Sequence, residues 1–269
     1  MSQRYHLDEN IQKRLREAAP TTAREDIAFI LRHPRLFAHV AKLGVRGALN
    51  TIRSDPTLGW LKSSDKVRAV IPDAILGAEW GGIDTFMALV KQHASSIDRC
   101  VEIGCGGGRI THLVRPLVSE LVAMDVSLTM LEEARRGGGN DVRYEVVKGF
   151  GNNLAAGAYS LAVSHDVFVH FDYDDVGVYL VNLHRSLRPG GRFVVSVYTL
   201  DSPAERETYR LQLVPKAGHA RRIRMLPAAA YEMLFETLGF EVLDAVRTSN
   251  NEYAGAKTFG HLNYVLRRP

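Results

Sequence analysis

The spacing of hydrophobic residues changes near position 97 of this 269-residue chain. Before that point, in residues 1–95, apolar side chains recur every three or four positions, as in "REDIAFILRHPRLFAHVAKLG", and prolines interrupt the pattern. This spacing is typical of amphipathic helices, and prolines divide them into short pieces. Residues 1–95 therefore predict an N-terminal helical region with little strand.

From residue 97 onward, short apolar runs alternate with helical patterns. Buried strands are predicted at "IDRCVEIG", "ELVAMDVS", "VRYEVVKGF", "YSLAVSHDVF" and "RFVVSVYTL". Residues 201–226 interrupt the alternation, and after them come a helix at "PAAAYEMLFETLG" and strands at "FEVLDAVRTS" and "KTFGHLNYVLRR". The alternation predicts an α/β fold with a doubly wound, mostly parallel seven-stranded sheet. The last two strands have no helix between them, so we expect them to pair antiparallel at one edge.

Composition narrows the class of protein. Hydrophobic residues make up 46% of the chain and charged residues 24%, as in ordinary globular proteins. No apolar run reaches the roughly 18 residues of a membrane span, and the start "MSQRYHLDEN" lacks the apolar core of a secretory signal. Cys100 and Cys105 lie around one predicted strand, which does not favour a disulfide between them. We therefore expect a cytoplasmic protein that makes no contact with a membrane.

The net charge of +4 is unevenly distributed. Residues 1–95 contain fourteen Lys and Arg against ten Asp and Glu, whereas the two signs balance in the rest of the chain. An excess this small does not by itself indicate nucleic-acid binding. A solvated basic surface is the simpler interpretation.

The segment "VEIGCGGGRI" combines a predicted strand with three glycines at alternate positions, Gly104, Gly106 and Gly108. In a doubly wound sheet the ligand lies outside the carboxyl ends of the strands, where glycines allow the backbone to approach it closely. A dinucleotide site would have the pattern G-x-G-x-x-G, whose third glycine falls on Arg109. This mismatch weakens the dinucleotide interpretation.

The pattern that does fit is E-x-G-x-G-x-G at the end of the first strand. Four further segments follow it in order: "VAMDVS", "YSLAVSHDVFVHF", "LRPGGRFVVSV" and "LGFEV". Through these motifs the chain resembles the class I S-adenosylmethionine-dependent methyltransferases over about residues 80–268. The resemblance implies S-adenosyl-L-methionine as cofactor, with the glycine loop along its methionine part and Asp125 on its ribose hydroxyls. The cofactor-binding residues that it implies are Glu102, Gly104, Cys105, Gly106, Gly108, Asp125, Val126, Ser127, Met130, Gly149, Phe150, Gly151, Ser164 and His165.

One motif departs from this family. After the third strand, members often carry an acidic residue that meets the adenine amino group, but this chain has "KGFGNN" there. Asn152 or Asn153 could accept that hydrogen bond and Phe150 could stack on adenine. The two asparagines could equally well only shape a turn.

The fourth strand is expected to end near the methyl group of the cofactor, and "SHDVFVH" places His165 and His170 there. A hydroxyl acceptor must lose a proton, and histidine is the natural base because its pKa is near the working pH. We therefore name both as candidate catalytic residues, although each could be structural and Asp166 could cap the turn. Asp172, Asp174 and Asp175 are interpreted as helix-capping residues, and no metal is expected.

The Asn/Asp-Pro-Pro-Tyr/Phe signature of many nucleic-acid methyltransferases is absent after the fourth strand. This favours a small-molecule acceptor with an oxygen target, in specialised metabolite or sugar biosynthesis, although carbon and nitrogen stay open. Residues 96–269 would form the methyltransferase domain. Residues 1–95 would form a helical cap over the acceptor, as the resemblance implies for small-molecule members.

Residues 201–226 are a candidate lid. This segment is rich in arginine, which suits an anionic or carrier-tethered acceptor as well as a solvated face. Trp80 and Tyr198 are candidate substrate contacts. Two alternatives stay open, an RNA-modifying methyltransferase and a cofactor-binding protein without methyl transfer activity.

Overall fold

The computed structural model describes residues 83–138, 141–212, 224–248, 251–253, 256–258 and 261–269. The chain divides into two units, and all of these residues belong to the one that comprises Met1–Tyr5, Leu76–Val214 and Ile223–Pro269. Most of the expected N-terminal cap, including Trp80, lies outside the described residues, so the cap stays a prediction.

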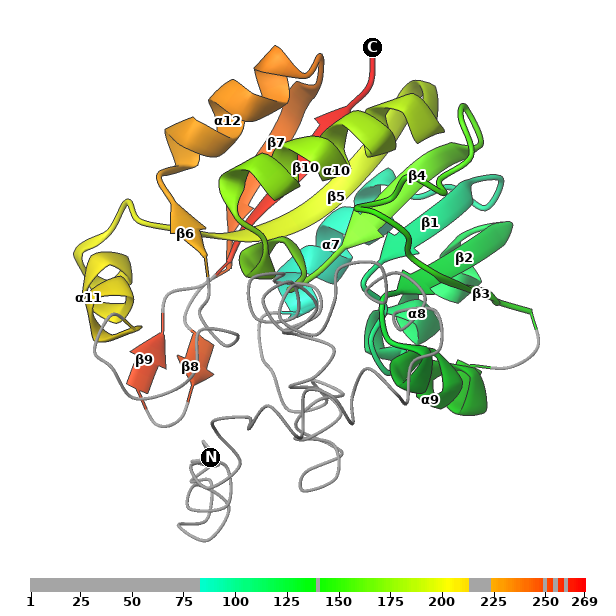
Figure 1. Ribbon diagram of the computed structural model, residues 1–269, viewed down its shortest axis with the longest axis horizontal. Coiled ribbons are helices and arrows are strands. Elements are labelled where there is room, and N and C mark those ends of the chain that lie inside the picture. Colours follow the sequence, from blue (N-terminus) through cyan, green and yellow to red (C-terminus); the bar gives the residue numbers. More distant parts are fainter. Residues whose placement is uncertain (1–82, 139–140, 213–223, 249–250, 254–255, 259–260) are drawn as a thin grey trace, which may run out of the picture. The chain divides into compact units, whose positions relative to one another are not determined.

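A mostly parallel sheet forms the centre of this unit (Figure 1). Its strands follow the order β3-β2-β1-β4-β5-β10-β7, and the short β6 pairs with β5. Strand β10 runs antiparallel to both β5 and β7 and lies between them. The predicted α/β class, with its antiparallel pairing of the last two predicted strands, is confirmed. The strand bounds are β1 Arg99–Ile103, β2 Glu120–Asp125, β3 Arg143–Val146, β4 Tyr159–Ser164, β5 Leu187–Thr199, β6 Met225–Leu226, β7 Glu241–Arg247 and β10 Leu262–Arg267. A separate pair consists of β8 Asn251–Tyr253 and β9 Ala256–Thr258.

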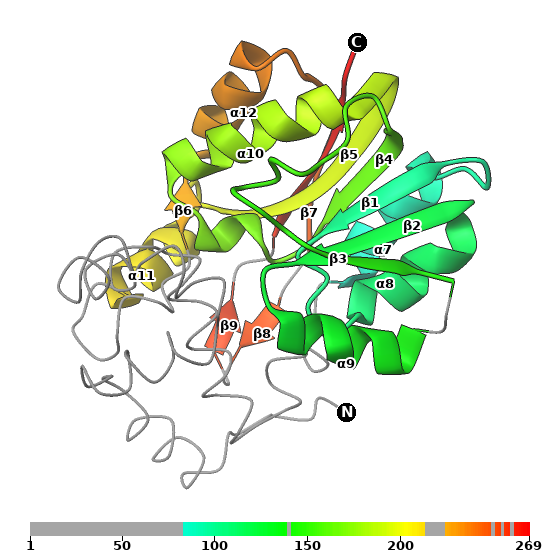
Figure 2. The same ribbon diagram turned by 45° about the vertical axis from the view of Figure 1, so that its right-hand side comes forward.

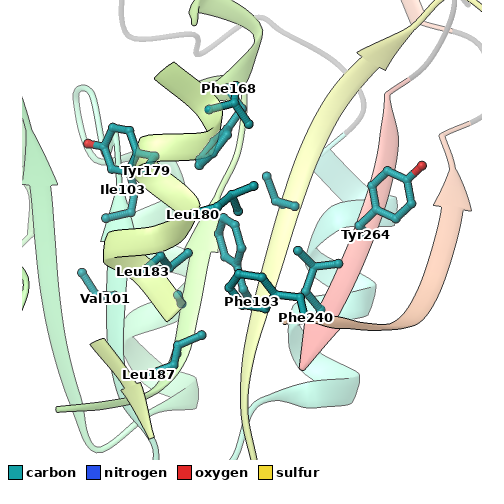
Figure 3. Packing of buried hydrophobic residues seen from close by; sticks show 14 of the residues in the cluster. Val101, Ile103, Phe168, Tyr179, Leu180, Leu183, Leu187, Phe193, Phe240 and Tyr264 are labelled. Atoms are coloured by element: carbon teal, nitrogen blue, oxygen red, sulfur yellow. The ribbon is translucent and has the colours of Figure 1, made fainter. Parts of the chain in front are cut away.

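Helices cover both faces of the sheet, as Figures 1 and 2 show. On one face, α10 and α12 pack over alternate strand residues such as Val101 and Phe193, and Figure 3 shows part of this packing. On the other face, α7, α8 and α9 contribute apolar side chains that meet the intervening strand residues, such as Cys100 and Val194. Burial on both faces is the reason why these strands are continuous apolar runs in the sequence. The bounds are α7 Ile83–His93, α8 Arg109–Val114, α9 Leu128–Gly138, α10 Tyr173–Ser186, α11 Pro203–Gln212 and α12 Ala228–Thr237.

Helix α11 lies in the segment where the sequence analysis predicted no element. It begins with a capping box, in which the backbone N–H of Ser202 donates to Glu205 Oε2 (2.7 Å) and that of Glu205 donates to Ser202 Oγ (3.2 Å). The spacing Ser-x-x-Glu, with Pro203 at the first helical position, was the signal that could have predicted it. The remainder of the predicted lid, residues 213–223, lies outside the described residues.

Two further expectations concern simple properties of the chain. Cys100 and Cys105 are both buried free thiols, so the expected absence of a disulfide between them is confirmed. Among the described residues, no helix has the length and apolarity required to cross a membrane.

Candidate active site

The glycine loop between β1 and α8 has the geometry of a close backbone approach. Gly104, Gly106 and Gly108 have positive φ angles of 72°, 53° and 92°, a region that L side chains rarely adopt. A Cβ on Gly104 would lie only 2.2 Å from Cγ2 of Val167. The loop passes next to the segment that follows β4, and only glycine fits there.

Asp125, at the end of β2, holds this loop in place. Its Oδ2 accepts a hydrogen bond from the backbone N–H of Gly106 (3.0 Å), and its Oδ1 accepts one from Ser127 (2.8 Å). Burial raises the pKa of Asp125, while these backbone hydrogen bonds oppose the rise. A carboxylate has about four lone-pair sites, so each oxygen keeps capacity for a further donor such as a ribose hydroxyl.

Glu102 lies below the loop on β1 and is almost fully buried. The Thr111 hydroxyl donates to its Oε2 at 2.6 Å, which connects α8 to β1. Burial raises the pKa of Glu102 to about 7, and the Thr111 hydrogen bond opposes this rise. Its protonated form is therefore much more favoured than that of an exposed glutamate.

The loop after β3 contains three consecutive residues with positive φ, Gly149 (47°), Phe150 (53°) and Gly151 (86°). The Phe150 ring packs edge-on against two aromatic rings of the core, Phe171 and Tyr179.

The side-chain oxygens of the two asparagines that follow this loop each accept a hydrogen bond within the protein. Asn152 Oδ1 accepts from the Asn182 side chain (3.0 Å) and Asn153 Oδ1 accepts from the backbone N–H of Lys148 (2.9 Å). These contacts favour the turn-shaping interpretation of the asparagines over adenine recognition.

The remaining predicted cofactor residues lie along the same edge of the sheet. Cys105 and Met130 are buried, and Val126 packs against the core. Ser164 Oγ donates to the carbonyl oxygen of Ile103 (3.1 Å), which joins the ends of β4 and β1. The structure therefore brings the predicted set together where the parallel strands end.

A cluster of three polar side chains lies at the end of β4. His261 Nε2 forms a hydrogen bond with Asp166 Oδ1, and His165 Nδ1 lies 3.2 Å from Asp166 Oδ2. The contact between His165 Nδ1 and Asp166 is within ion-pair distance, and Nε2 of His165 has no hydrogen-bond partner among the described residues. The side chains of both histidines are buried, with exposures of 0% and 2%. The cluster thus holds one carboxylate between two imidazoles.

Neighbouring elements enclose this cluster. Phe86 of α7 meets His165 edge-on with ring centroids 4.7 Å apart, and Tyr198 of β5 packs on His261 at 4.3 Å. Arg109, the first residue of α8, lies with its guanidinium 3.9 Å from Asp166 Oδ2.

Asp166 itself has a positive φ of 60°. Its backbone N–H donates to Ser196 Oγ at 2.9 Å, which attaches this strained residue to β5.

The charges of the cluster set its protonation. Burial raises the pKa of Asp166, but the adjacent imidazoles of His261 and His165 outweigh burial and hold that pKa well below its usual range. Burial lowers the pKa of His165, and Asp166 only partly offsets this effect. His165 is therefore a neutral imidazole beside an ionised carboxylate at neutral pH.

His170, the second histidine candidate, lies in a short 3-10 helix, Phe168–His170, outside the cluster. Burial lowers its pKa to about 4, although Asp166 acts in the opposite direction. Asp172 stands at the N-cap of α10, yet its side chain forms no capping hydrogen bond and pairs with Arg224 Nε at 2.5 Å instead. Asp174 and Asp175 lie in the first turn of α10, where their negative charge interacts favourably with the positive end of the helix dipole.

His261 was not among the predicted site residues. It precedes β10, and because β10 runs antiparallel, its first residues lie at the edge where β4 and β5 end. The expected antiparallel pairing of "KTFGHLNYVLRR" was the signal that could have placed this histidine there. Ligand atoms of His165, Asp166 and His261 lie within 4.8 Å of one another, so the cluster also has a donor set that could hold a metal.

Comparisons with known proteins agree with this geometry. A family described as a methyltransferase domain matches residues 30–245. No curated protein matches the sequence significantly.

Several solved structures share the fold. A chain from the complex between the Haloferax volcanii Trm112 methyltransferase activator and a methyltransferase has a TM-score of 0.61 at 18% identity, over 75% of this chain and 96% of that one. The Burkholderia thailandensis 1,6-didemethyltoxoflavin-N1-methyltransferase, bound to 1,6-didemethyltoxoflavin and S-adenosylhomocysteine, has a TM-score of 0.59 at 21% identity, over 76% and 86%. The [4+2]-cyclase SpnF has a TM-score of 0.54 at 17% identity, over 69% and 81%.

Proposed function

The chain belongs to this methyltransferase domain family, and from that premise we propose that it methylates a hydroxyl oxygen of a small molecule. It is an S-adenosylmethionine-dependent methyltransferase, and its cofactor is S-adenosyl-L-methionine. The proposal that the acceptor is a hydroxyl oxygen rests on the buried cluster of His165, Asp166 and His261. A hydroxyl must lose a proton as its oxygen is methylated, whereas a neutral amine already has a free lone pair.

The residues at the carboxyl edge of the sheet fit this cofactor. Gly104 leaves backbone bare where a Cβ would collide with Val167, and Asp125 keeps lone pairs for two ribose hydroxyls. When bound, the cofactor supplies a methyl group on a positively charged sulfur. The contacts that we propose comprise Glu102, Gly104, Cys105, Gly106, Gly108, Asp125, Val126, Ser127, Met130, Gly149, Phe150, Gly151, Ser164 and His165.

The chain's own contribution is to orient the acceptor, exclude water and take up its proton. Methyl transfer is a direct displacement, so an in-line placement of the acceptor oxygen supplies much of the rate. Nε2 of His165 has no hydrogen-bond partner among the described residues, and burial favours the neutral ring, so this nitrogen is available as the proton acceptor. We propose His165 as the base, with His170 as the weaker candidate because burial lowers its pKa to about 4.

A base of lowered pKa suits an acceptor whose hydroxyl ionises readily. A phenol has a pKa of about 10, whereas that of water is about 15.7, and transfer to His165 costs correspondingly less from a phenol. We therefore propose a phenol or enol as the acceptor class. An anionic or carrier-tethered form of it would suit the arginine-rich segment 201–226, and Tyr198 beside His261 is proposed as an acceptor contact.

The experiment is a transfer assay with methyl-labelled S-adenosylmethionine and the full chain. Its panel contains phenols, enols, sugar alcohols, amines and a structured RNA. We expect label in a phenol or enol, and a loss of about 100-fold in rate for His165→Gln with unchanged affinity for S-adenosylhomocysteine. The matched control is His184→Gln, which makes the same replacement on α10, away from the cluster. Transfer only to an amine, a carbon acid or the RNA would overturn the oxygen assignment.

A second candidate is favoured by one comparison. SpnF shares the fold and is a [4+2]-cyclase, so this fold also occurs in a protein named for another reaction. Tight binding of S-adenosylmethionine with no transfer to any class of the panel would support a cofactor-binding protein without methyl transfer activity.

A further inference from the structure

Arg109 lies where the glycine loop meets the cluster after β4. It directly follows Gly108, the last glycine of the loop, and is the first residue of α8. Its guanidinium reaches across to Asp166, with Nη2 3.9 Å from Oδ2. The loop and the segment after β4 are neighbours, since a Cβ on Gly104 would collide with Val167. Arg109 therefore places a positive group beside both the cofactor loop and the proposed base.

Asp166 is close to this guanidinium but is hydrogen-bonded to other groups. Its carboxylate bonds the imidazoles of His261 and His165. The separation of 3.9 Å from Arg109 is too long for a hydrogen bond. The contact between Arg109 and Asp166 is therefore electrostatic, and it does not use the planar donor fork of the guanidinium.

The Arg109 side chain is mostly buried, with 20% of its surface exposed. Burial lowers its pKa, and the charge of Asp166 opposes this change. The sequence of α8, "RITHLV", contains no acidic residue that could pair with it along the helix. A guanidinium in a partly desolvated site binds a planar carboxylate through two parallel N–H···O hydrogen bonds. Arg109 thus has the chemistry and the placement to hold a carboxylate in this site.

We propose that Arg109 is a specificity-determining residue that binds a ligand carboxylate between the glycine loop and the cluster. The proposal rests on the function proposed above, because it concerns the same site. Two ligands of that function can supply the group, the acceptor and the methionine end of the cofactor.

The position of the guanidinium favours the acceptor as the source of the carboxylate. Arg109 and His165, the proposed base, contact the same oxygen of Asp166, at 3.9 and 3.2 Å. One small molecule can therefore place its hydroxyl at His165 and its carboxylate at Arg109. The acceptor class that fits is a hydroxy acid whose hydroxyl is a phenol or enol.

The acceptor arm of the test measures binding and needs no turnover. Calorimetry on the full chain saturated with S-adenosylhomocysteine compares ortho-, meta- and para-hydroxybenzoate with their neutral amides. We expect at least one hydroxybenzoate to bind about tenfold more tightly than its amide, and Arg109→Gln to remove this preference. Arg109→Lys keeps the charge but loses the planar fork, so it should retain only part of the preference.

The cofactor arm examines the other source of a carboxylate. Methylthioadenosine shares the adenosine and the sulfur of S-adenosylhomocysteine but has no amino-acid group. If Arg109 binds the methionine end, Arg109→Gln should weaken S-adenosylhomocysteine about tenfold to a hundredfold and leave methylthioadenosine unchanged. This result would support the carboxylate site and assign it to the cofactor.

The matched control is Arg136→Gln, which makes the same replacement on the exposed surface of α9 and should change none of these affinities. Thermal unfolding shows whether each variant folds, and Arg109→Lys takes the place of an unfolded Arg109→Gln, because it keeps a positive charge beside Asp166. The proposal is overturned if the Arg109 variant binds S-adenosylhomocysteine like the parent and shows the parent's relative affinities for hydroxybenzoates and amides.

The outcome is independent of the transfer assay. Loss of the carboxylate site would leave methyl transfer to a hydroxyl standing. Failure of every acceptor class in the transfer assay would leave both binding arms standing, so the two proposals fail separately.

Discussion

The two halves of the candidate site are built differently. The cofactor half consists mainly of backbone groups from one short segment, Gly104 to Gly108, held by Asp125 at the end of the next strand. The acid–base half consists of side chains from residues just after β4 and just before β10, which meet only in the folded sheet. A backbone site depends on which residues fit its conformation, whereas a side-chain site depends on charge and proton affinity. Substitutions in the two halves should therefore differ in kind as well as in size.

The largest effect should come from Gly104→Ala. Its Cβ would lie 2.2 Å from Val167 at a positive φ, so we expect a loss of about 3 kcal/mol in the free energy of unfolding and no measurable binding of S-adenosylhomocysteine. Gly157→Ala is the matched control, because Gly157 also has a positive φ but nothing lies within 4 Å of its Cβ position. It should cost only about 1 kcal/mol in urea unfolding. Equal losses in the two variants would mean that the contact with Val167 is unimportant.

His165→Gln should act on rate and leave stability and cofactor affinity nearly unchanged. We expect a fall in turnover of about 100-fold. In the parent, activity should decline as the pH drops through the pKa of His165, because the protonated ring cannot accept a proton. Burial lowers that pKa, so the decline should lie below pH ~6.5, the ordinary value for histidine. A decline centred above that value would contradict the assignment.

Asp125→Asn should weaken S-adenosylhomocysteine binding about tenfold to a hundredfold, because two ribose hydroxyls lose a charged acceptor. The asparagine oxygen can still accept one of the two backbone hydrogen bonds from Gly106 and Ser127, so some loss of stability is also expected. Calorimetry measures the affinity, and Asp141→Asn, on the exposed surface, is the control. Unchanged affinity would remove Asp125 from the cofactor site.

Glu102→Gln should change how stability depends on pH. The pKa of Glu102 in the folded protein is about 7, above the unfolded value of about 4.3. The folded chain therefore holds an extra proton between these values, and its stabilising effect is fully present below pH ~4.3 and lost as the pH rises to about 7. The glutamine side chain of the variant does not ionise, so the variant does not lose stability as the pH rises. It should be more stable than the parent by about 2 kcal/mol at pH 8. Unfolding in urea at pH 5 and 8 measures it, and identical curves for parent and variant would contradict the assignment.

The smallest effect should come from His170→Gln. Its lowered pKa, about 4, makes it a weak proton acceptor, and it lies outside the cluster. We expect turnover within about threefold of the parent. A loss as large as that of His165→Gln would transfer the role of base to His170 and remove the contrast between the histidines.

Prediction from the sequence succeeded where the signal is local. Alternating strand and helix patterns predicted the sheet, and "VEIGCGGGR" with "VAMDVS" predicted the loop and acid that the structure joins by hydrogen bonds. It missed α11, whose sequence is strongly polar and whose capping box was overlooked. The adenine contacts expected of Asn152 or Asn153 stay a prediction: each side-chain oxygen accepts one hydrogen bond within the protein and has a second lone pair.

The sequence by itself determined the fold class and the position of the glycine loop, because hydrophobic periodicity and glycine conformation are properties of neighbouring residues. It also pointed to His165. Only the tertiary structure decided what surrounds that histidine. Antiparallel pairing of β10 brings His261 to the edge where β4 ends, and the Asp166 carboxylate is held there against a residue 95 positions away. Electrostatic interaction depends on distance in space, and sequence separation carries almost no information about it.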